Sequence, residues 1–310
     1  MISAALSPLG ALYALSVRAK MAGAKPYRAK ARVLCVGNLT AGGSGKTPIA
    51  IALGLMLAAR GKRIAFLSHG YGGRLHGPLQ VDSARHSAAD VGDEALLLAA
   101  KAPTIVARNR ADGARLADSL RLDIIVMDDG FQNFQLAKDV SLIVIDAELG
   151  FGNRRLIPAG PLRERPEDGL KRADALVLMG DGEPKLPPFA GSVFRARTLP
   201  LAPDALAGRA VFAFAGIGRP EKFFQTLRGM GARVLGMRAL PDHHRYTSIE
   251  LAALRALAES FAALLVTTEK DFVRIAELDR RAILPVPVHA VFEQDPDLSA
   301  LLDTLAAARA

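Results

Sequence analysis

The sequence predicts an α/β fold, in which helices cover both faces of a mostly parallel sheet, with a second, smaller α/β domain after it. Two observations support this expectation. Short, continuously apolar runs alternate with segments of helical periodicity through the first two-thirds of the chain, as in sheets whose strands are buried on both faces. A stretch rich in Gly and Pro at residues 180–188 then interrupts the pattern before it resumes.

The first expected strand covers residues 32–36, and a glycine-rich loop and a helix over 48–60 follow it. Further strands are expected at 63–68, 103–107, 123–127, 140–145 and 173–179, with helices at 92–101 and 110–120. After the interruption, strands are expected at 209–215 and 264–268, and helices at 220–230, 248–261 and 297–309. The expected organisation is an N-terminal segment at 1–32, a core domain at 33–180, a linker at 181–208 and a smaller domain at 209–310.

The loop after the first strand carries the strongest functional signal. It reads Gly-Asn-Leu-Thr-Ala-Gly-Gly-Ser-Gly-Lys-Thr-Pro over 37–48, and its place between a strand and a helix is typical of a phosphate-binding loop. The usual spacing has glycine where this chain has Thr40, so the loop matches the tighter G-G-x-G-K-T variant. The alternative is an ordinary turn before a helix. The loop predicts a P-loop NTPase-like core that binds a nucleoside triphosphate through Thr40, Ala41, Gly42, Gly43, Ser44, Gly45, Lys46 and Thr47.

Two consecutive acidic residues, Asp128 and Asp129, follow the expected strand at 123–127. The carboxyl ends of parallel strands face the ligand, and a carboxylate there holds Mg²⁺ or its water shell opposite the Lys-Thr pair of the loop. The alternative is a turn in which Asp caps and Gly130 bends the chain. Together with the loop upstream, the pair predicts a Mg²⁺ site made by Thr47, Asp128 and Asp129.

Two further segments hold groups suited to proton transfer. A histidine of Asp242-His243-His244-Arg245-Tyr246 could move a proton or orient a carboxylate base, and the alternative is a surface loop with a helix cap. A single cysteine and the lack of further histidines nearby argue against zinc. Asp93 stands at the start of an expected helix, where an acid stabilises the N-terminus. Spacing alone assigns Asp93 no catalytic role.

Charge and composition limit the classes of protein. Half of the residues are hydrophobic, and a single cysteine leaves no disulfide framework, which favours a packed protein in a reducing compartment. Of the net charge of +9, six positive charges lie in residues 1–32, which contain no acid. Ahead of most of these bases, apolar residues recur at helical spacing: Ile2, Leu6, Leu9, Leu12, Tyr13 and Val17.

This N-terminal pattern predicts an interfacial helix followed by a polybasic stretch, and therefore contact with a membrane surface. The alternative is a helix packed on the body of the domain. The apolar run is too short and too interrupted for a transmembrane span, and its charge follows the apolar residues, unlike a secretory signal. No nucleic-acid-binding module accompanies the bases. Guanine specificity is not supported, because Thr268-Glu269-Lys270-Asp271 places lysine one position late for [NT]-K-x-D.

The motifs, taken in order, resemble those of the tetraacyldisaccharide 4′-kinase family, the lipid A 4′-kinases of Gram-negative bacteria. The resemblance covers roughly residues 33–246 and rests on several linked motifs, which are more specific than a phosphate-binding loop alone. They read G-N-L-T-A-G-G-S-G-K-T-P, G-Y-G-G, G-D-E-A, D-D-G-F-Q, G-F-G-N-R-R-L-I-P-A-G-P-L-R-E and P-D-H-H-R-Y. The N-terminal Leu-Ser-Pro-Leu-Gly-Ala-Leu-Tyr is also similar to the start of the family.

The resemblance implies transfer of the ATP γ-phosphate to the 4′-hydroxyl of a tetraacyldisaccharide 1-phosphate, which gives lipid IVA. It implies a peripheral enzyme at the cytoplasmic face of the inner membrane, with the lipid A disaccharide 1-phosphate as substrate and no obligate protein partner. By the same resemblance Asp93 is the catalytic base, His243 raises or holds its basicity, and Lys46 binds phosphate. Glu164 is implied to join the acidic pair near the metal.

Two other functions remain as alternatives at this point. The chain could be a P-loop regulatory or metallochaperone NTPase, because the G-G-x-G-K-T spacing also occurs in such proteins, although they often carry Lys where this chain has Ala41. It could also be a basic membrane-binding protein without catalysis. Product formation from ATP and the lipid separates the kinase from both.

Overall fold

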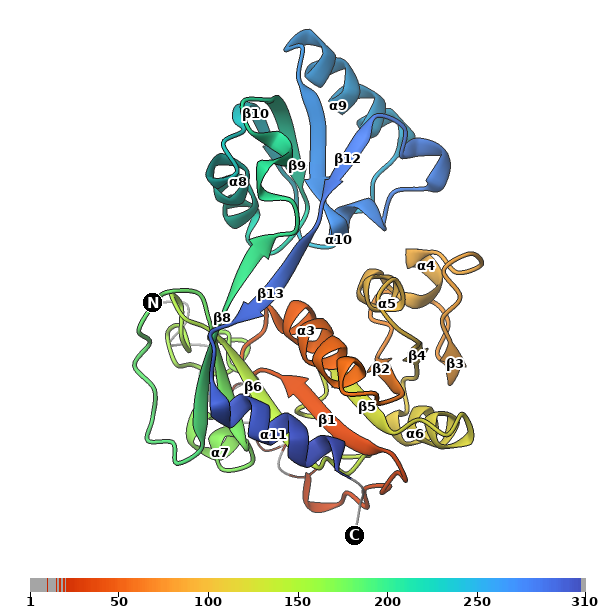
Figure 1. Ribbon diagram of the computed structural model, residues 1–310, viewed down its shortest axis with the longest axis vertical. Helices are drawn as coiled ribbons and strands as arrows, with labels where there is room; N and C mark the ends of the chain where they lie inside the picture. The colour runs from red at the N-terminus through yellow and green to blue at the C-terminus, as the bar shows by residue number, and fades with distance from the viewer. Residues whose placement is uncertain (1–9, 11–14, 16, 18, 20, 308–310) are drawn as a thin grey trace.

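The computed structural model of the protein describes residues 10, 15, 17, 19 and 21–307 (Figure 1). Within these residues the strands form two sheets, with the orders β13-β8-β7-β6-β1-β5-β2-β4-β3 and β10-β9-β11-β12. The larger sheet contains β1 (Arg32–Gly37), β2 (Ile64–Ser68), β3 (Leu79–Gln80), β4 (Thr104–Val106), β5 (Ile124–Asp128), β6 (Val140–Asp146), β7 (Ala175–Met179), β8 (Ser192–Pro200) and β13 (Val288–Phe292). The smaller sheet contains β9 (Ala210–Ala215), β10 (Arg233–Ala239), β11 (Leu264–Thr268) and β12 (Ile283–Val286).

Parallel pairing dominates both sheets, which confirms the predicted fold class. In the larger sheet β1 lies between β5 and β6 and pairs with both in parallel. The antiparallel pairs lie at the two edges of that sheet, where β3 pairs with β4 and β13 pairs with β8. In the smaller sheet β9 lies between β10 and β11, and its pairs with both are parallel.

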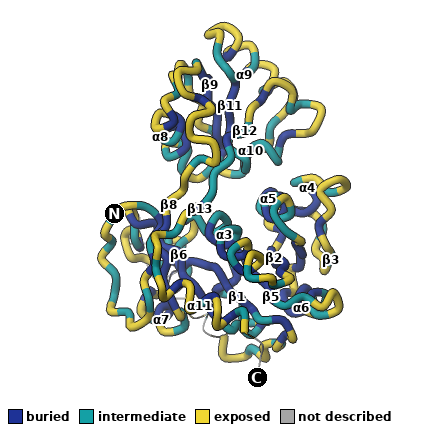
Figure 2. The backbone as a smooth tube through the Cα atoms, in the orientation of Figure 1, coloured by how far each residue is buried: buried dark blue, intermediate teal, exposed yellow. Residues whose placement is uncertain are grey.

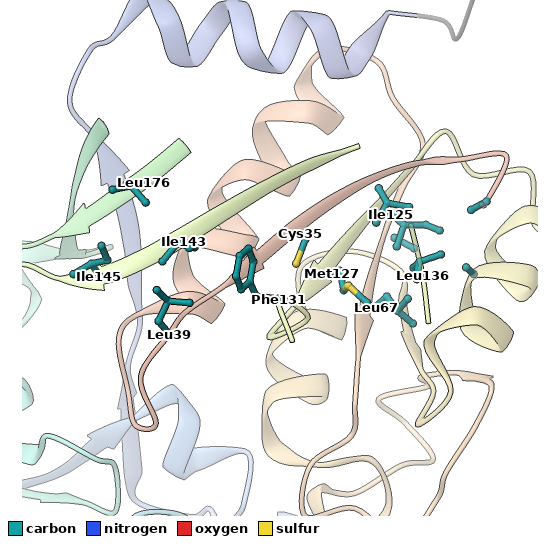
Figure 3. Packing of buried hydrophobic residues seen from close by; sticks show 14 of the residues in the cluster. Cys35, Leu39, Leu67, Ile125, Met127, Phe131, Leu136, Ile143, Ile145 and Leu176 are labelled. Atoms are coloured by element: carbon teal, nitrogen blue, oxygen red, sulfur yellow. The ribbon is translucent and has the colours of Figure 1, made fainter. Parts of the chain in front are cut away.

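The strand β1 shows how alternate residues build two cores. Val33 and Cys35 pack on one face of the larger sheet, and Leu34 and Val36 pack on the other. Figure 3 shows the first of these cores. Because both faces are covered, the central strands are buried along their length, as Figure 2 shows. This double burial is the reason why the strands appear in the sequence as continuous apolar runs.

Helices cover both sheets and are fixed by local capping. Around the larger sheet lie α3 (Lys46–Ala59), α4 (Ala88–Val91), α5 (Asp93–Ala99), α6 (Arg110–Ser119), α7 (Pro166–Leu170) and α11 (Pro296–Ala306). Around the smaller sheet lie α8 (Pro220–Gly229), α9 (Ser248–Ser260) and α10 (Glu269–Phe272). The side chain of Asn109 accepts a hydrogen bond from the Ala111 amide at the start of α6, and Thr247 forms a capping box with Glu250 at the start of α9.

Two strands of the larger sheet, β8 and β13, lead to and from the smaller sheet (Figure 1). The segment 181–208, expected as a linker, therefore contains a strand that pairs with β7. The last part of 209–310, expected in the smaller domain, returns to the larger sheet, where α11 packs Leu298 and Leu302 into the core beside α3. The sequence pattern missed β8 because its exposed and buried residues alternate and because it carries Arg195 and Arg197.

The expected N-terminal helix lies mostly outside the described residues. The described positions 10, 15, 17, 19, 21 and 22 are helical. Gly10 is buried, and a Cβ atom built on it would lie 3.1 Å from Cβ of Leu156, so this part of the segment packs against the body of the larger domain. Among the described residues, no helix is long and apolar enough to cross a membrane.

Candidate active site

A cleft of about 1480 Å³ lies between the two sheets. The larger sheet contributes the loop after β1 and the ends of β2, β5 and β6, and the smaller sheet contributes the loops after β9, β10 and β11. Both sheets thus present the carboxyl ends of parallel strands, where open α/β sheets place their ligands. The cleft therefore collects most of the residues that the motifs selected.

The predicted phosphate-binding loop lines this cleft from Gly42 to Thr47. Gly45 has φ +85° immediately before α3, and no side chain caps the first amides of that helix. Ser44 lies inside the loop, where its Oγ accepts a hydrogen bond of 3.0 Å from Nδ2 of Asn38. Thr40 forms an antiparallel bridge with Leu162, so its backbone is extended and glycine is not needed there. The amides of Ala41 and Ser44 donate to the carbonyl oxygens of Pro161 and Gly42, at 2.7 and 3.1 Å, so a phosphate chain would meet the other amides of the loop.

Asp128 lies behind the loop and contacts it directly. Oγ1 of Thr47 donates a hydrogen bond of 2.9 Å to Oδ2 of Asp128, while Oδ1 of this carboxylate is buried and has no hydrogen-bond partner among the described residues. Burial raises the pKa of Asp128 to about 7, and the neighbouring carboxylates of Glu94 and Asp129 add to the shift. An unpartnered carboxylate oxygen next to a threonine hydroxyl is a donor set that suits a hard divalent cation.

Asp129 has a different environment from its neighbour. Its φ is +50°, and its two oxygens accept hydrogen bonds of 2.8 and 3.1 Å from the guanidinium of Arg163. Nζ of Lys46 lies 3.8 Å from Oδ1 of the same carboxylate. Burial alone would raise the pKa of Asp129, but Lys46 and Arg163 outweigh it and lower this pKa. Asp129 therefore holds the side chains of Lys46 and Arg163 beside the loop.

Glu164 does not join this acidic pair. Its Oε1 accepts a hydrogen bond of 3.0 Å from Nε2 of Gln132, and its Oε2 pairs with Arg172. Glu164 is buried but is absent from the residues that line the cleft. Both oxygens are thus engaged in holding the 150–164 loop, which differs from the expectation of a metal ligand. The described residues contain no cluster of three acidic, histidine or cysteine ligands.

Asp93 and His243 are in contact, although 150 positions separate them in the sequence: His243 lines the cleft, while Asp93 is buried and is not among the lining residues. Asp93 is the first residue of α5, and the preceding Gly92 has φ +87°. A Cβ atom on Gly92 would lie 2.5 Å from the carbonyl oxygen of Tyr71, so only glycine permits this approach. Oδ2 of Asp93 lies 3.1 Å from Nδ1 of His243. The structure thus brings together the two residues that the resemblance paired.

The backbone separates His243 from its neighbour His244. His243 has φ +59° and lines the cleft, where its ring packs 5.5 Å from the ring of Tyr71. Nε2 of His244 lies 3.1 Å from Oε1 of Glu250, which belongs to the capping box of α9. His244 thus supports the start of a helix, while His243 faces Asp93.

Sequence reasoning missed two cations at Asp93. Nε of Arg274 donates a hydrogen bond of 2.7 Å to Oδ2 of Asp93, and Nζ of Lys270 lies 3.2 Å from Oε1 of the adjacent Glu94. Burial favours a raised pKa of Asp93, but Lys270, Arg274 and His243 together lower it. The available signal for Lys270 is its place in α10, two residues after the carboxyl end of β11.

A loop that suits a phosphate chain thus shares one cleft with the His243 imidazole, which a buried carboxylate contacts from behind. This arrangement fits transfer of a phosphoryl group to a hydroxyl acceptor, since such transfer needs both phosphate binding and a base. The fold and the cleft place the chain in the class of P-loop phosphotransferases.

Comparison with known proteins identifies the family. A family model described as Tetraacyldisaccharide-1-P 4'-kinase matches residues 2–307. The tetraacyldisaccharide 4'-kinase of Parvibaculum lavamentivorans is 49% identical over 320 residues, covering 96% of this chain and 91% of that protein. That of Rhodospirillum centenum is 48% identical over 310 residues, covering 98% and 92%. The crystal structure of the "apo" form of LpxK from Aquifex aeolicus in complex with ATP matches with a TM-score of 0.79 and 26% identity, covering 99% of this chain and 100% of that one.

The chain therefore belongs to the tetraacyldisaccharide-1-P 4′-kinase family. It is a lipid kinase of lipid A biosynthesis, and its acceptor is a lipid A disaccharide.

Proposed function

We propose that the chain transfers the γ-phosphate of ATP to the 4′-hydroxyl of a tetraacyldisaccharide 1-phosphate, with Asp93 as the base and His243 as its partner. The observation that carries these roles is the 3.1 Å contact between Oδ2 of the buried Asp93 and Nδ1 of His243, because His243 lines the same cleft as the phosphate-binding loop. A sugar hydroxyl has a pKa far above neutrality, so a base must take its proton as the phosphoryl group arrives.

The donor is held by the loop from Thr40 to Thr47. Its backbone amides and the N-terminus of α3 attract the β- and γ-phosphates, and the ammonium of Lys46 adds a full positive charge beside them. Arg163 and Asp129 fix the neighbourhood of Lys46 through their bidentate pair. A lysine held near a carboxylate in this way is oriented before ATP binds.

Thr47 and Asp128 are the residues that fit Mg²⁺. The fit rests on the buried, unpartnered Oδ1 of Asp128 and on the hydroxyl of Thr47 at 2.9 Å from Oδ2. Mg²⁺ commonly takes one or two protein carboxylates and completes its shell with water and phosphate oxygens, so two protein ligands suffice. When bound, the ion offsets negative charge on the phosphates. Its charge also favours the ionised form of Asp128, whose pKa is otherwise raised to about 7.

The acceptor places the enzyme at a membrane. Its acyl chains remain in a bilayer while the sugar enters the cleft, which suits a peripheral enzyme on the cytoplasmic face of the inner membrane. The basic stretch within residues 1–32 supports this location, because cations beside an apolar segment bind anionic headgroups. The described bases Lys25 and Arg28 are exposed.

The direct test is a thin-layer assay with radiolabelled ATP and the disaccharide 1-phosphate. We expect labelled lipid IVA from the wild-type chain, and a loss of about 100-fold or more in kcat for Asp93→Asn and for Lys46→Ala. Arg255→Met is the control, since Arg255 bonds the carbonyl oxygen of Arg281 within the second domain. ATP hydrolysis without any lipid product, together with nucleotide-dependent dimerisation, would instead establish the regulatory NTPase.

A further inference from the structure

We propose that Arg274 is a positioning residue of the kinase site, which reaches from the second domain to hold Asp93 of the first domain against His243. The proposal rests on the proposed role of Asp93 as the base. Arg274 follows α10, and its side chain is 6% exposed, while that of Asp93 is 5% exposed. Nε of Arg274 donates to the same oxygen, Oδ2, that faces Nδ1 of His243.

The guanidinium is itself held from behind. Its Nη1 donates a hydrogen bond of 2.6 Å to the carbonyl oxygen of Gly216 and another of 3.0 Å to Oδ1 of Asp271. Asp271 is fully buried and also accepts from the Tyr246 hydroxyl at 2.8 Å. Both bonds of Arg274 come from Nη1. Because the guanidinium is planar, they also fix the direction of its other donors, Nε among them, toward Asp93.

The same carbonyl oxygen ties Arg274 to His243. The backbone amide of His243 donates a hydrogen bond of 3.2 Å to the carbonyl oxygen of Gly216, which also accepts from Arg274. A Cβ atom on Gly216 would lie 3.0 Å from Cβ of His244 and 3.1 Å from Oδ1 of Asp271, so the segments are closely packed here. Arg274 and His243 therefore reach Asp93 as one unit of the second domain.

The charged groups around Arg274 and His243 determine how a change at Arg274 alters the pH dependence of activity. Lys270 and His243 face Asp93 together with Arg274, and Glu94 is its neighbour on α5. Beyond His243, Oδ2 of Asp242 lies 3.9 Å from Nε2. Removal of the Arg274 charge raises the pKa of a buried carboxylate, because an opposite charge at this distance lowers it by about 1–3 units. The base then becomes protonated at higher pH, and activity is lost earlier as pH falls.

The test compares Arg274→Met and Arg274→Lys in the full chain. For Arg274→Met we expect kcat to fall by about 100-fold, because the base loses its fixed position, with KM for ATP unchanged. We also expect the acidic limb of kcat/KM to move up by about 1 unit or more. Arg274→Lys keeps the positive charge but loses the planar guanidinium with its several fixed donors. We therefore expect an acidic limb of kcat/KM close to that of wild type and a reduced kcat.

A readout that needs no turnover separates this proposal from the kinase mechanism. The carboxyl carbon of Asp93, assigned by the loss of its NMR signal in Asp93→Asn, should titrate at higher pH in Arg274→Met than in wild type. Arg255→Met, which also removes a second-domain arginine, should leave both the titration and kcat unchanged. An unshifted Asp93 titration, or wild-type kcat in Arg274→Lys, would overturn the positioning role. A wild-type chain that makes no lipid product would overturn the kinase mechanism, while the titration still decides on Arg274.

Discussion

Two adjacent histidines have different roles because one backbone angle turns them apart. His243, at φ +59°, faces Asp93, while His244 reaches Glu250 at the start of α9. The loop sequence alone does not separate two identical neighbours, since the difference lies in the positive φ of His243 and in the partner that each ring meets in the fold. The contact with Asp93 depends on the fold of both domains.

This difference predicts opposite effects of one substitution at the two positions. His243→Gln should lower kcat by about 100-fold, because Asp93 loses the partner that orients it. His244→Gln should leave kcat near wild type and change the free energy of unfolding by less than about 1 kcal/mol, because the glutamine amide reaches as far as Nε2 and keeps a donor for Glu250. Steady-state kinetics and urea unfolding measure the two quantities. Equal kcat losses in both variants would contradict the division of roles.

Residues within local motifs could be predicted from the sequence, and residues that act through long-range contacts could not. Lys46 and Thr47 begin α3 after the loop that follows β1, and Asp128 ends β5, so the sequence places them at the same sheet edge. Arg274 contacts Asp93 over 181 positions, and no spacing rule connects the two. Glu164 lies within a family motif, yet its environment engages it with Arg172. A motif fixes which amino acid stands at a position, while the neighbours of that side chain in the folded protein determine what it does.

At the level of elements, continuous apolar runs located the buried parallel strands to within a residue or two. The strands β8, β12 and β13 were not expected, because they lie at or near a sheet edge and mix buried with exposed residues. Such strands lack the continuous apolar signal. The boundary between the domains was consequently placed by Gly and Pro content instead of sheet membership.

The helix α3, which carries Lys46 and Thr47, is fixed against β2 by a glycine. A Cβ atom on Gly54 would lie 2.7 Å from the ring of Phe66, which is fully buried. Gly54→Ala should therefore destabilise the protein by a net of about 1–2 kcal/mol, since overpacking outweighs the gain in helix propensity.

The matched control for Gly54 is Gly229 at the end of α8, where an added Cβ would meet no atom within 4 Å. Gly229→Ala should stabilise the protein by about 0.4–1 kcal/mol, because it restricts the unfolded chain. Urea unfolding of both variants measures the pair. A stabilised Gly54→Ala protein would show that α3 can move away from β2 without cost.

At the scale of the whole molecule, ion pairs bridge the two domains on either side of the cleft. On one side α5 and the residues after it meet α10 and the turn that follows, through the pairs Asp93–Arg274, Glu94–Lys270 and Lys101–Glu269. On the other side the end of β6 meets α8, where Oδ2 of Asp146 accepts hydrogen bonds of 2.6 Å from Arg219 and 2.9 Å from Lys222, and Glu148 pairs with the same two cations. Together with β8 and β13, these contacts hold the phosphate-binding loop and the base in one cleft.

The second of these bridges makes the relation between the domains sensitive to acid. Burial favours a raised pKa of Asp146, but Lys222 and Arg219 outweigh it, so this pKa lies below its usual range. A carboxylate with a lowered folded-state pKa stabilises its contact above the unfolded pKa of about 3.9, and this stabilisation is lost as pH falls through the folded value. The pKa of Asp93, on the other side of the cleft, is also lowered, so the stabilisation from its contacts is likewise lost as pH falls.

We therefore expect the domains to separate as pH falls below about 4, with the radius of gyration from small-angle scattering rising before helical circular dichroism is lost. The double variant Asp146→Asn/Glu148→Gln removes at every pH both carboxylates that pair with Arg219 and Lys222, so it should raise the radius of gyration already at neutral pH and flatten its acid dependence. Glu167→Gln breaks the exposed pair with Arg154 inside the first domain and should match wild type. If the double variant instead keeps the wild-type radius at neutral pH and the wild-type acid dependence, the ion pairs on the Asp93 side and the two connecting strands fix the cleft without this bridge.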